Sequence, residues 1–320
     1  MAMNRKTYIG ALFMALIAML ALNSCSPTMT GAVRDDSSLT GVSKKLAPGS
    51  AYTGPKLRVG VVNFENKSTS KATKFGESAA DILGTILQKT GRFIVIPQQD
   101  LAKIMDQQQL GASGSIDPST AAKMGRILGL NAIVTGSITA YSEVVEGGDF
   151  LVYKRKERIA RVTVDYRVVD TTTGFQIMAD SGQGVYSKET KEVLGMGSET
   201  SYDADLRDGA LRDALTKAMV NMLKQVESTE WTGRIASIQG GMVYINAGQK
   251  TGLKVGDVLV VQELGNEVMD PQTGLVLGRA PGKKIGELII TGFFGTGNDA
   301  SVASIQSGSG FEVNDLVKMK

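Results

Sequence analysis

The sequence lacks histidine altogether and contains one cysteine and one tryptophan among 320 residues. Without histidine the chain has no Ser-His or Cys-His nucleophile pair, no imidazole general base and no nitrogen ligand of the usual kind for zinc. The glycine motifs that bind phosphates and dinucleotides are also missing from the sequence. Catalysis by carboxylates alone would need a distinct pair of acids, and no pair stands out. The sequence therefore predicts no enzymatic activity, no cofactor and no metal site.

The single cysteine, Cys25, follows a segment typical of a secretory signal. Arg5 and Lys6 precede an apolar run over residues 9–22, which is too short to span a bilayer. The Leu-x-Ser-Cys ending resembles the lipobox of bacterial lipoproteins, in which the chain is cut before the cysteine and its sulfur is acylated. The alternative is an ordinary signal peptide with a chance cysteine. We expect residues 1–24 to be a lipoprotein signal peptide and Cys25 to carry the lipid.

The residue after the cysteine and the net charge indicate where such a protein would lie. Ser26 is not the aspartate that resembles an inner-membrane retention signal, so we expect a lipid anchor in the outer membrane, facing the periplasm. Acyl chains, at about 0.8 kcal/mol per buried methylene, hold a protein at a membrane without a spanning helix. Loss of Arg5 and Lys6 with the signal lowers the formal charge from +3 to about +1. No nucleic-acid partner is expected on this charge.

The composition divides the remaining chain into a linker and two folded parts. Residues 25–54 are rich in Ser, Thr, Gly and Pro, which predicts a lipidated flexible tether. Residues 55–228 combine buried strands with amphipathic helices, and residues 229–320 show short strands between glycine turns. The predicted fold class is α/β (α+β), with a three-layer-like α/β periplasmic domain followed by a small all-β domain, a partly closed barrel.

Local signals in the α/β part place several elements. A helix with apolar residues at helical spacing ends at Gly91, and another has Asp117 as N-cap and Gly129 as a left-handed closing residue. A long helix is expected over residues 206–226. The strand over 160–168 alternates strictly, and we interpret its apolar face as covered by helices rather than by lipid. That face consists of Ala160, Val162, Val164, Tyr166 and Val168.

Three segments of the α/β part stand out behind the lipobox: residues 59–64, residues 129–138 (Gly-Leu-Asn-Ala-Ile-Val-Thr-Gly-Ser-Ile) and residues 164–174. Together, and in this order, they resemble the curli-secretion channel family (CsgG/HfaB). The resemblance implies an outer-membrane lipoprotein that assembles with itself into a homo-oligomeric ring. Channels of this family export amyloid subunits of the curli type without nucleotides. Their partners are the secreted fibre subunits and accessory periplasmic proteins.

Residues 231–317 are similar to the C-terminal domain of flagellar assembly protein T, which implies a binding or assembly module. Trp231, at the start of this part, is interpreted as a packing anchor between the domains rather than a ligand platform. The curli channel itself has no such C-terminal domain, so the architecture departs from that channel. The matching segments are residues 252–257, Asp270-Pro271-Gln272-Thr273-Gly274, Gly286-Glu287 and Asn314-Asp315-Leu316-Val317.

Two regions bear on whether the chain lines a pore. Each subunit of a channel member contributes two membrane-spanning hairpins, at places corresponding to residues 141–160 and 181–206 here. A lipid-facing strand needs about nine to eleven residues with alternate apolar side chains, but both regions carry charges on both faces, as in 154–158. We interpret 154–158 as a solvated hairpin tip. These charges favour the alternative function, a non-pore periplasmic scaffold or regulator supporting a flagellar or cell-wall assembly.

The resemblance also points to a loop that would form the narrow ring of the pore. The corresponding segment, residues 65–75, is shortened and has no dense aromatic cluster. Its position makes Asn66 and Phe75 the candidate pore-loop residues, although Phe75 at a helix start is also typical of a core residue. We expect a ring-forming lipoprotein that exports or assembles extracellular fibre subunits, and leave open whether the ring conducts.

Overall fold

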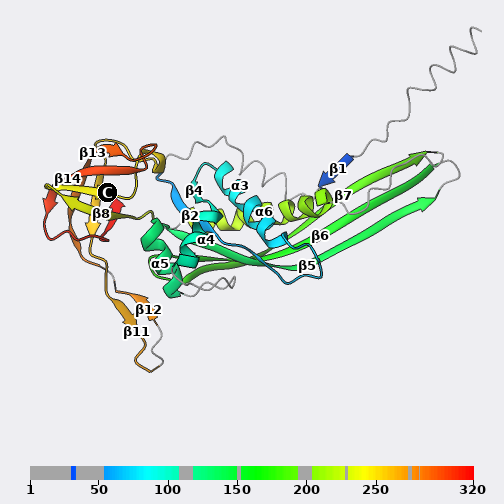
Figure 1. The fold of residues 1–320 in the computed structure, drawn as a ribbon, viewed down its shortest axis with the longest axis horizontal. Helices are drawn as coiled ribbons and strands as arrows, with labels where there is room; N and C mark the ends of the chain where they lie inside the picture. The colour runs from blue at the N-terminus through cyan, green and yellow to red at the C-terminus, as the bar shows by residue number, and fades with distance from the viewer. Residues whose placement is uncertain are drawn as a thin grey trace, which may run out of the picture.

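A computed structural model describes the fold of residues 30–33, 54–107, 118–149, 153–193, 204–227 and 230–320, apart from residues 273–275 and 281. A long mixed sheet with helices on both faces extends to one end of the molecule, and a closed barrel lies at the other end (Figure 1). This arrangement confirms the predicted class, a layered α/β part followed by a small β barrel. Among the described residues, no helix is both long enough and apolar enough to cross a membrane.

The sheet has the strand order β1-β7-β6-β5-β2-β4, and β3 pairs with β5 beside β2. The strands β2, β4 and β5 pair in parallel, whereas β5, β6, β7 and β1 pair antiparallel. The three longest strands, β5 to β7, each have 18 residues. The bounds are β1 (Thr30–Val33), β2 (Leu57–Val61), β3 (Glu65–Asn66), β4 (Phe93–Ile96), β5 (Ala132–Asp149), β6 (Tyr153–Asp170) and β7 (Gln176–Val193).

Four helices cover the two faces of this sheet. The helices α3 (Phe75–Lys89) and α6 (Ala204–Glu227) share one core with the alternating face of β6, whose five predicted residues are at most 1% exposed. A smaller core on the other face is formed with α4 (Gln98–Gln107) and α5 (Pro118–Leu128). The expected helix ends are present, because Gly91 (φ 70°) and Gly129 (φ 64°) follow α3 and α5 in the left-handed region. The helical cover predicted for residues 160–168 is thus confirmed.

Helix α6 approaches β7 unusually closely because the contact positions are glycines. A Cβ atom added at Gly184 would overlap the backbone of Ala210 and Ala214, and one at Gly182 would overlap the carbonyl of Ala214. On the helix side, Gly209 leaves room for the ring of Tyr186. Side chains at these glycines would therefore push the helix away from the sheet.

The barrel closes in the order β10-β13-β14-β9-β8-β15, so it is fully closed where the sequence predicted partial closure. Pairing of β15 with both β10 and β8 closes it, and such a long-range pairing has no local sequence signal. A separate hairpin of β11 and β12 projects from it (Figure 1). The bounds are β8 (Gly233–Gln239), β9 (Met242–Ile245), η1 (Gln249–Thr251), β10 (Val258–Gln262), β11 (Glu267–Met269), β12 (Val276–Arg279), β13 (Lys284–Phe294), β14 (Ala300–Gly308) and β15 (Leu316–Met319).

The sheet and the barrel are joined by hydrogen bonds and by buried apolar side chains. The Asn131 side chain accepts from the Arg58 amide (2.9 Å) and donates to the Thr232 carbonyl (2.6 Å). The Lys56 amide donates to the Thr251 carbonyl, again at 2.6 Å. Trp231 is buried in the same hydrophobic cluster as the barrel residues, in agreement with its expected packing role.

Beyond the helices, the three long strands continue as a projection that we call the arm, defined as residues 145–149, 153–158 and 188–193 (Figure 1). The arm takes up much of the two regions where membrane hairpins were considered, and residues 194–203 lie outside the described residues. The strand β1 pairs with β7 beside the arm, at Tyr186 to Glu189. The sequence placed no element in residues 25–54, because a four-residue strand that depends on a distant partner has no local signal.

Candidate functional site at the root of the arm

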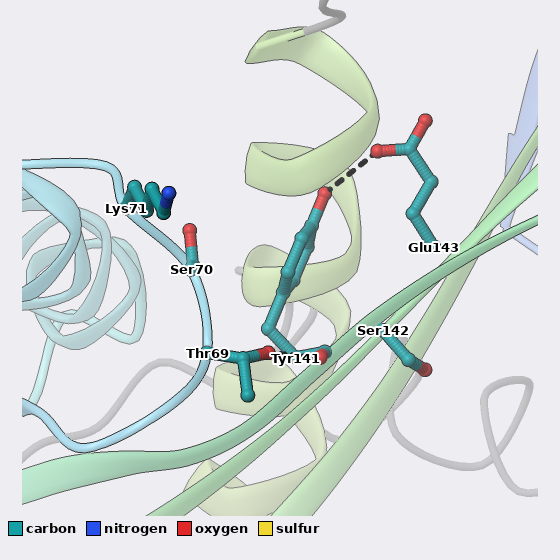
Figure 2. A pocket seen from close by; sticks show the side chains of 6 residues that line it. All are labelled: Thr69, Ser70, Lys71, Tyr141, Ser142 and Glu143. Carbon is teal, nitrogen blue, oxygen red and sulfur yellow. Dashed lines mark hydrogen bonds between the residues drawn. The ribbon is translucent and has the colours of Figure 1, made fainter.

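An open cavity of about 630 Å³ lies where the arm leaves the body, between β5 and the loop that follows β3 (Figure 2). The loop is the segment that the family resemblance assigns to the pore ring. All six lining residues carry a polar or charged group, and the ring of the tyrosine adds an apolar surface. They are Thr69, Ser70, Lys71, Tyr141, Ser142 and Glu143.

Asn66 shapes the loop on one side of this cavity. Its Oδ1 accepts from the amide (3.1 Å) and the hydroxyl (2.6 Å) of Ser68, and its Nδ2 donates to the Ser70 carbonyl (2.9 Å). Such side-chain bonds to a nearby backbone are the turn chemistry for which asparagine is favoured. Asn66 is exposed, and it ends the parallel pairing of β3 with β5 by turning the chain away.

Tyr141 forms the other wall of the cavity. Its hydroxyl donates to Glu143 Oε2 at 3.1 Å, as Figure 2 shows, and its carbonyl accepts from the Thr69 hydroxyl at 3.2 Å. Glu143 in turn accepts from Arg158 Nε on the neighbouring strand, at 2.9 Å. These bonds connect the loop, β5 and β6 at the point where the arm begins.

Phe75 lies beneath this wall as the first residue of α3. Its ring meets the Tyr141 ring edge-on, with centroids 5.8 Å apart and planes at 84°. The Arg207 guanidinium of α6 lies 5.3 Å from the centroid of the same ring. Phe75 is 0% exposed, whereas Asn66 is at the surface. The two candidate pore-loop residues therefore have opposite surroundings, and Cys25, the third predicted site residue, lies outside the described residues.

Among the described residues, none pairs with the outer edge of β5 beside the cavity. The carbonyls of Val134, Ile138 and Tyr141 face the β2–β3 side, because they accept from Val62 N, Lys67 N and the Thr69 hydroxyl. Since peptide groups alternate along a strand, those of Glu143 and Val145 face the same side. In the described part of the chain β3 ends before reaching them. The site can therefore offer backbone hydrogen bonds to an extended polypeptide.

Sequence reasoning did not identify Tyr141 and Glu143 as neighbours of the loop. The available signal was that Tyr141, Glu143 and Val145 share one face of a strand. A hairpin register would have placed these residues beside the basic run that includes Arg158. The exact register depends on an irregularity between Ile138 and Ala140. Such a shift cannot be read from the sequence, and one residue of slip moves every side chain to the other face.

A second cavity, of about 400 Å³, lies between the sheet and the barrel. Burial lowers the pKa of Arg58, and the nearby carboxylate of Asp299 opposes this shift. The Nε atom of Arg58 is buried without a partner among the described residues. Arg234, from the barrel, lines the same cavity. The groups come from both parts of the chain, so this cavity marks their junction. In the described residues no group of His, Cys, Asp and Glu could hold a metal ion.

The chain is similar to several known proteins. A protein of Neisseria meningitidis serogroup B named as a lipoprotein, NMB1126/NMB1164, is 26% identical over 223 residues, which are 66% of this chain and 95% of that protein. Among solved structures, lipoprotein GNA1162 from Neisseria meningitidis gives a TM-score of 0.31 at 15% identity, covering 54% of this chain and 99% of that one. The LpoB C-terminal domain from Escherichia coli gives 0.30 at 19% identity, covering 45% and 92%.

A family model matches a larger part of the chain than the sheet alone. It is the model of the curli production assembly/transport component CsgG, and it matches residues 47–254, which contain the strands β2 to β7 of the sheet, its helices, the arm and the first strands of the barrel. The match extends over more than half of the 320 residues. The chain belongs to the family of the curli production assembly/transport component CsgG.

Proposed function

We propose that this protein is an outer-membrane lipoprotein that is anchored through Cys25 and self-associates into a ring. The ring exports or assembles extracellular fibre subunits and carries out no enzymatic chemistry. The observation that carries this proposal is the family match over residues 47–254, whose family is described as an assembly and transport component. The relative from Neisseria meningitidis, which is named as a lipoprotein, supports the anchor.

The anchor is the first part of the proposal to test. Cells grown with a clickable palmitate analogue are expected to label the wild-type protein and not the Cys25→Ser variant. Mass spectrometry of the mature N-terminus is expected to begin at an acylated Cys25. An unlabelled wild-type protein with a free thiol would contradict the lipoprotein assignment.

The ring is tested by electron microscopy of the lipidated protein extracted in mild detergent. We expect closed rings of one copy number, and monomers at all concentrations would contradict self-association. Single-channel recording of the same rings then tests export through a pore. If they conduct, Asn66→Ala is expected to change the conductance, with Ser38→Ala as a control outside the loop. Unchanged conductance in Asn66→Ala would count against the pore-loop role, and Phe75→Ala is less informative because it also disturbs the core.

The second candidate function is a tethered periplasmic scaffold that supports a flagellar or cell-wall assembly. One observation favours it: the register places Arg158 opposite Lys188 on one face of the arm, and Glu157, the neighbour of Arg158 in β6, lies on the other face. Lysine or arginine facing lipid at mid-depth costs about 2–4 kcal/mol each. Rings that form without a detergent belt around the arm and do not conduct would select this function, with accessory periplasmic proteins as its partners.

A further inference from the structure

The strand β1 joins the arm only a few residues after the proposed anchor, and this inference rests on the proposed lipidation of Cys25. Thr30 lies opposite Glu189 and Val33 opposite Tyr186, in an antiparallel pairing with β7. Ser187, in the middle of the paired stretch of β7, is only 8% exposed. The segment Thr-Gly-Ala-Val has two β-branched residues and no charge, which suits a strand added to a sheet edge.

The direction of the pairing decides which end of β1 is nearer the tip. The strand β7 runs from the body toward the tip, so the antiparallel β1 enters on the tip side, at Thr30. Five peptide units separate Cys25 from Thr30, and a fully extended chain of that length spans at most about 18 Å. From Glu189 to the end of β7 at Val193 is about 13 Å, at a rise of about 3.3 Å per residue. The lipid is therefore held within the reach of the arm.

The far part of the body and the barrel lie beyond the reach of the anchor. The near end of α6 contacts β7 at Tyr186 and Gly184, within about 17 Å of Glu189, whereas Gly182 is already about 23 Å away along the strand, at the same rise per residue. The barrel is farther still, at the end of the molecule opposite the arm (Figure 1). A flexible tether of 30 residues would leave all these parts equally free to approach the membrane.

We propose that β1 clamps the lipid anchor to the arm, so that the arm contacts the lipid headgroups and the barrel is held away from the membrane. The partner is the headgroup layer rather than the hydrocarbon. Charged positions occupy both faces of the arm, because Glu157 and Arg158 are neighbours in β6 and point to opposite faces, with Lys188 opposite Arg158. Lipid phosphates and amines can bind such charges in water, whereas hydrocarbon cannot.

The test measures energy transfer from single sites on the protein to a headgroup-labelled acceptor in vesicles. The acylated Cys25 has no free thiol, so a cysteine introduced at an exposed position takes a donor dye specifically. Val145→Cys reports on the arm, where Val145 is 59% exposed, and Val313→Cys reports on the barrel, where Val313 is 53% exposed. The full lipidated chain is reconstituted in vesicles of phosphatidylethanolamine and phosphatidylglycerol. Transfer is expected to be several-fold stronger from Val145→Cys than from Val313→Cys.

The clamp is then broken with Gly31→Pro combined with Ala32→Pro. Adjacent peptide groups of a strand point to opposite sides, so one of the two prolines removes a hydrogen bond to β7. The matched control, Ser37→Pro with Ser38→Pro, changes two positions that follow β1 in the sequence. Transfer from Val145→Cys is expected to fall several-fold only in the first double variant, until it matches transfer from Val313→Cys.

The outcomes separate this inference from the proposed function. Equal transfer from both sites, or no effect of the prolines in β1, would overturn the clamp while the protein remains bound to vesicles. Failure of the protein to bind vesicles at all would instead contradict the lipid anchor, which the palmitate labelling tests independently. A disulfide formed within one chain by Ala32→Cys with Ser187→Cys would support the pairing directly, because these positions are register partners.

Discussion

The strands β5, β6 and β7 pair continuously along their length, but the half toward the body is apolar on one face and the half toward the tip is charged. Toward the body, β6 buries Ala160, Val162 and Val164 beneath helices, and its other face alternates with polar residues. Toward the tip, the same pairing continues, but positions 153–158 carry five charges among six residues. Backbone pairing therefore extends well past the hydrophobic core that stabilises the sheet.

The comparison shows what each half depends on. In the body half, apolar area removed from water supplies roughly 25 cal/mol per Å², and tight packing adds to it. In the arm, rows of like charges such as Arg158 with Lys188 cost stability when they lie directly opposite. The side chains of the arm therefore contribute little to the stability of the sheet. Substitutions should be costly in the body half and mild in the arm.

The largest effect is expected at Tyr166, which is 1% exposed and donates to the Ala218 carbonyl at 2.9 Å. Tyr166→Ala should lower the free energy of unfolding by about 4 kcal/mol, because it leaves a cavity under α6 and removes a buried hydrogen bond. Urea denaturation of the protein without its signal measures this loss. The arm control, Val145→Ala, should change it by less than about 0.5 kcal/mol. Similar losses of unfolding free energy for Tyr166→Ala and Val145→Ala would contradict the difference between the body half and the arm.

A slightly smaller loss is expected for Gly184→Val, about 3 kcal/mol, because the new side chain meets the backbone of α6 and not a movable side chain. The same denaturation experiment measures it. The matched control is Gly241→Asn in the barrel hairpin, where added atoms meet open space and asparagine accepts a positive φ. A Gly184→Val variant as stable as wild type would show that α6 can move off the strand freely.

Much of this fold can be predicted from sequence, because the spacing of apolar residues and the residues that end helices are local features of the chain. The apolar spacing of α3, the left-handed glycines after α3 and α5, and the alternation over residues 160–168 each correspond to elements of the structure. In each case the pattern of buried and exposed positions follows from residues that are close together in the sequence.

The parts that escaped prediction depend on distant partners. The strand β1 exists through β7, the closure of the barrel depends on β15, and Tyr141 meets Phe75 across 66 positions of the sequence. The arm was recognised by its charges as unsuited to lipid, but its length was not predicted, since polar strands have no apolar alternation to extend. The domain boundaries at 54 and 228 remain predictions, and expression of residues 229–320 alone tests the second.

An intermediate effect on the free energy of unfolding is expected at alkaline pH. It arises from the buried tyrosine, Tyr166, and not from exposed tyrosines. Burial raises the pKa of Tyr166 above its ordinary value near 10, and the carboxylate of Asp180 raises it further. The unfolded chain ionises first, so the stability is complete below pH 10 and falls above it. The loss is roughly 1 kcal/mol per pH unit until the folded group also ionises. Urea denaturation between pH 8 and 11 should show a shallower decline for Tyr166→Phe, and identical slopes would contradict the assignment.

The smallest effect is expected at the root of the arm, where Glu143 binds Arg158 and accepts from Tyr141. All three side chains are near solvent, so the pair should contribute only about 0.5 kcal/mol in a double-mutant cycle with Glu143→Gln and Arg158→Gln. Its contribution should decrease further with added salt, because screening acts on exposed charges. A coupling energy as large as the Tyr166→Ala loss would mean that the arm is stabilised by its charges. The charged strands would then form a folded unit of their own and not an extension held up by the body.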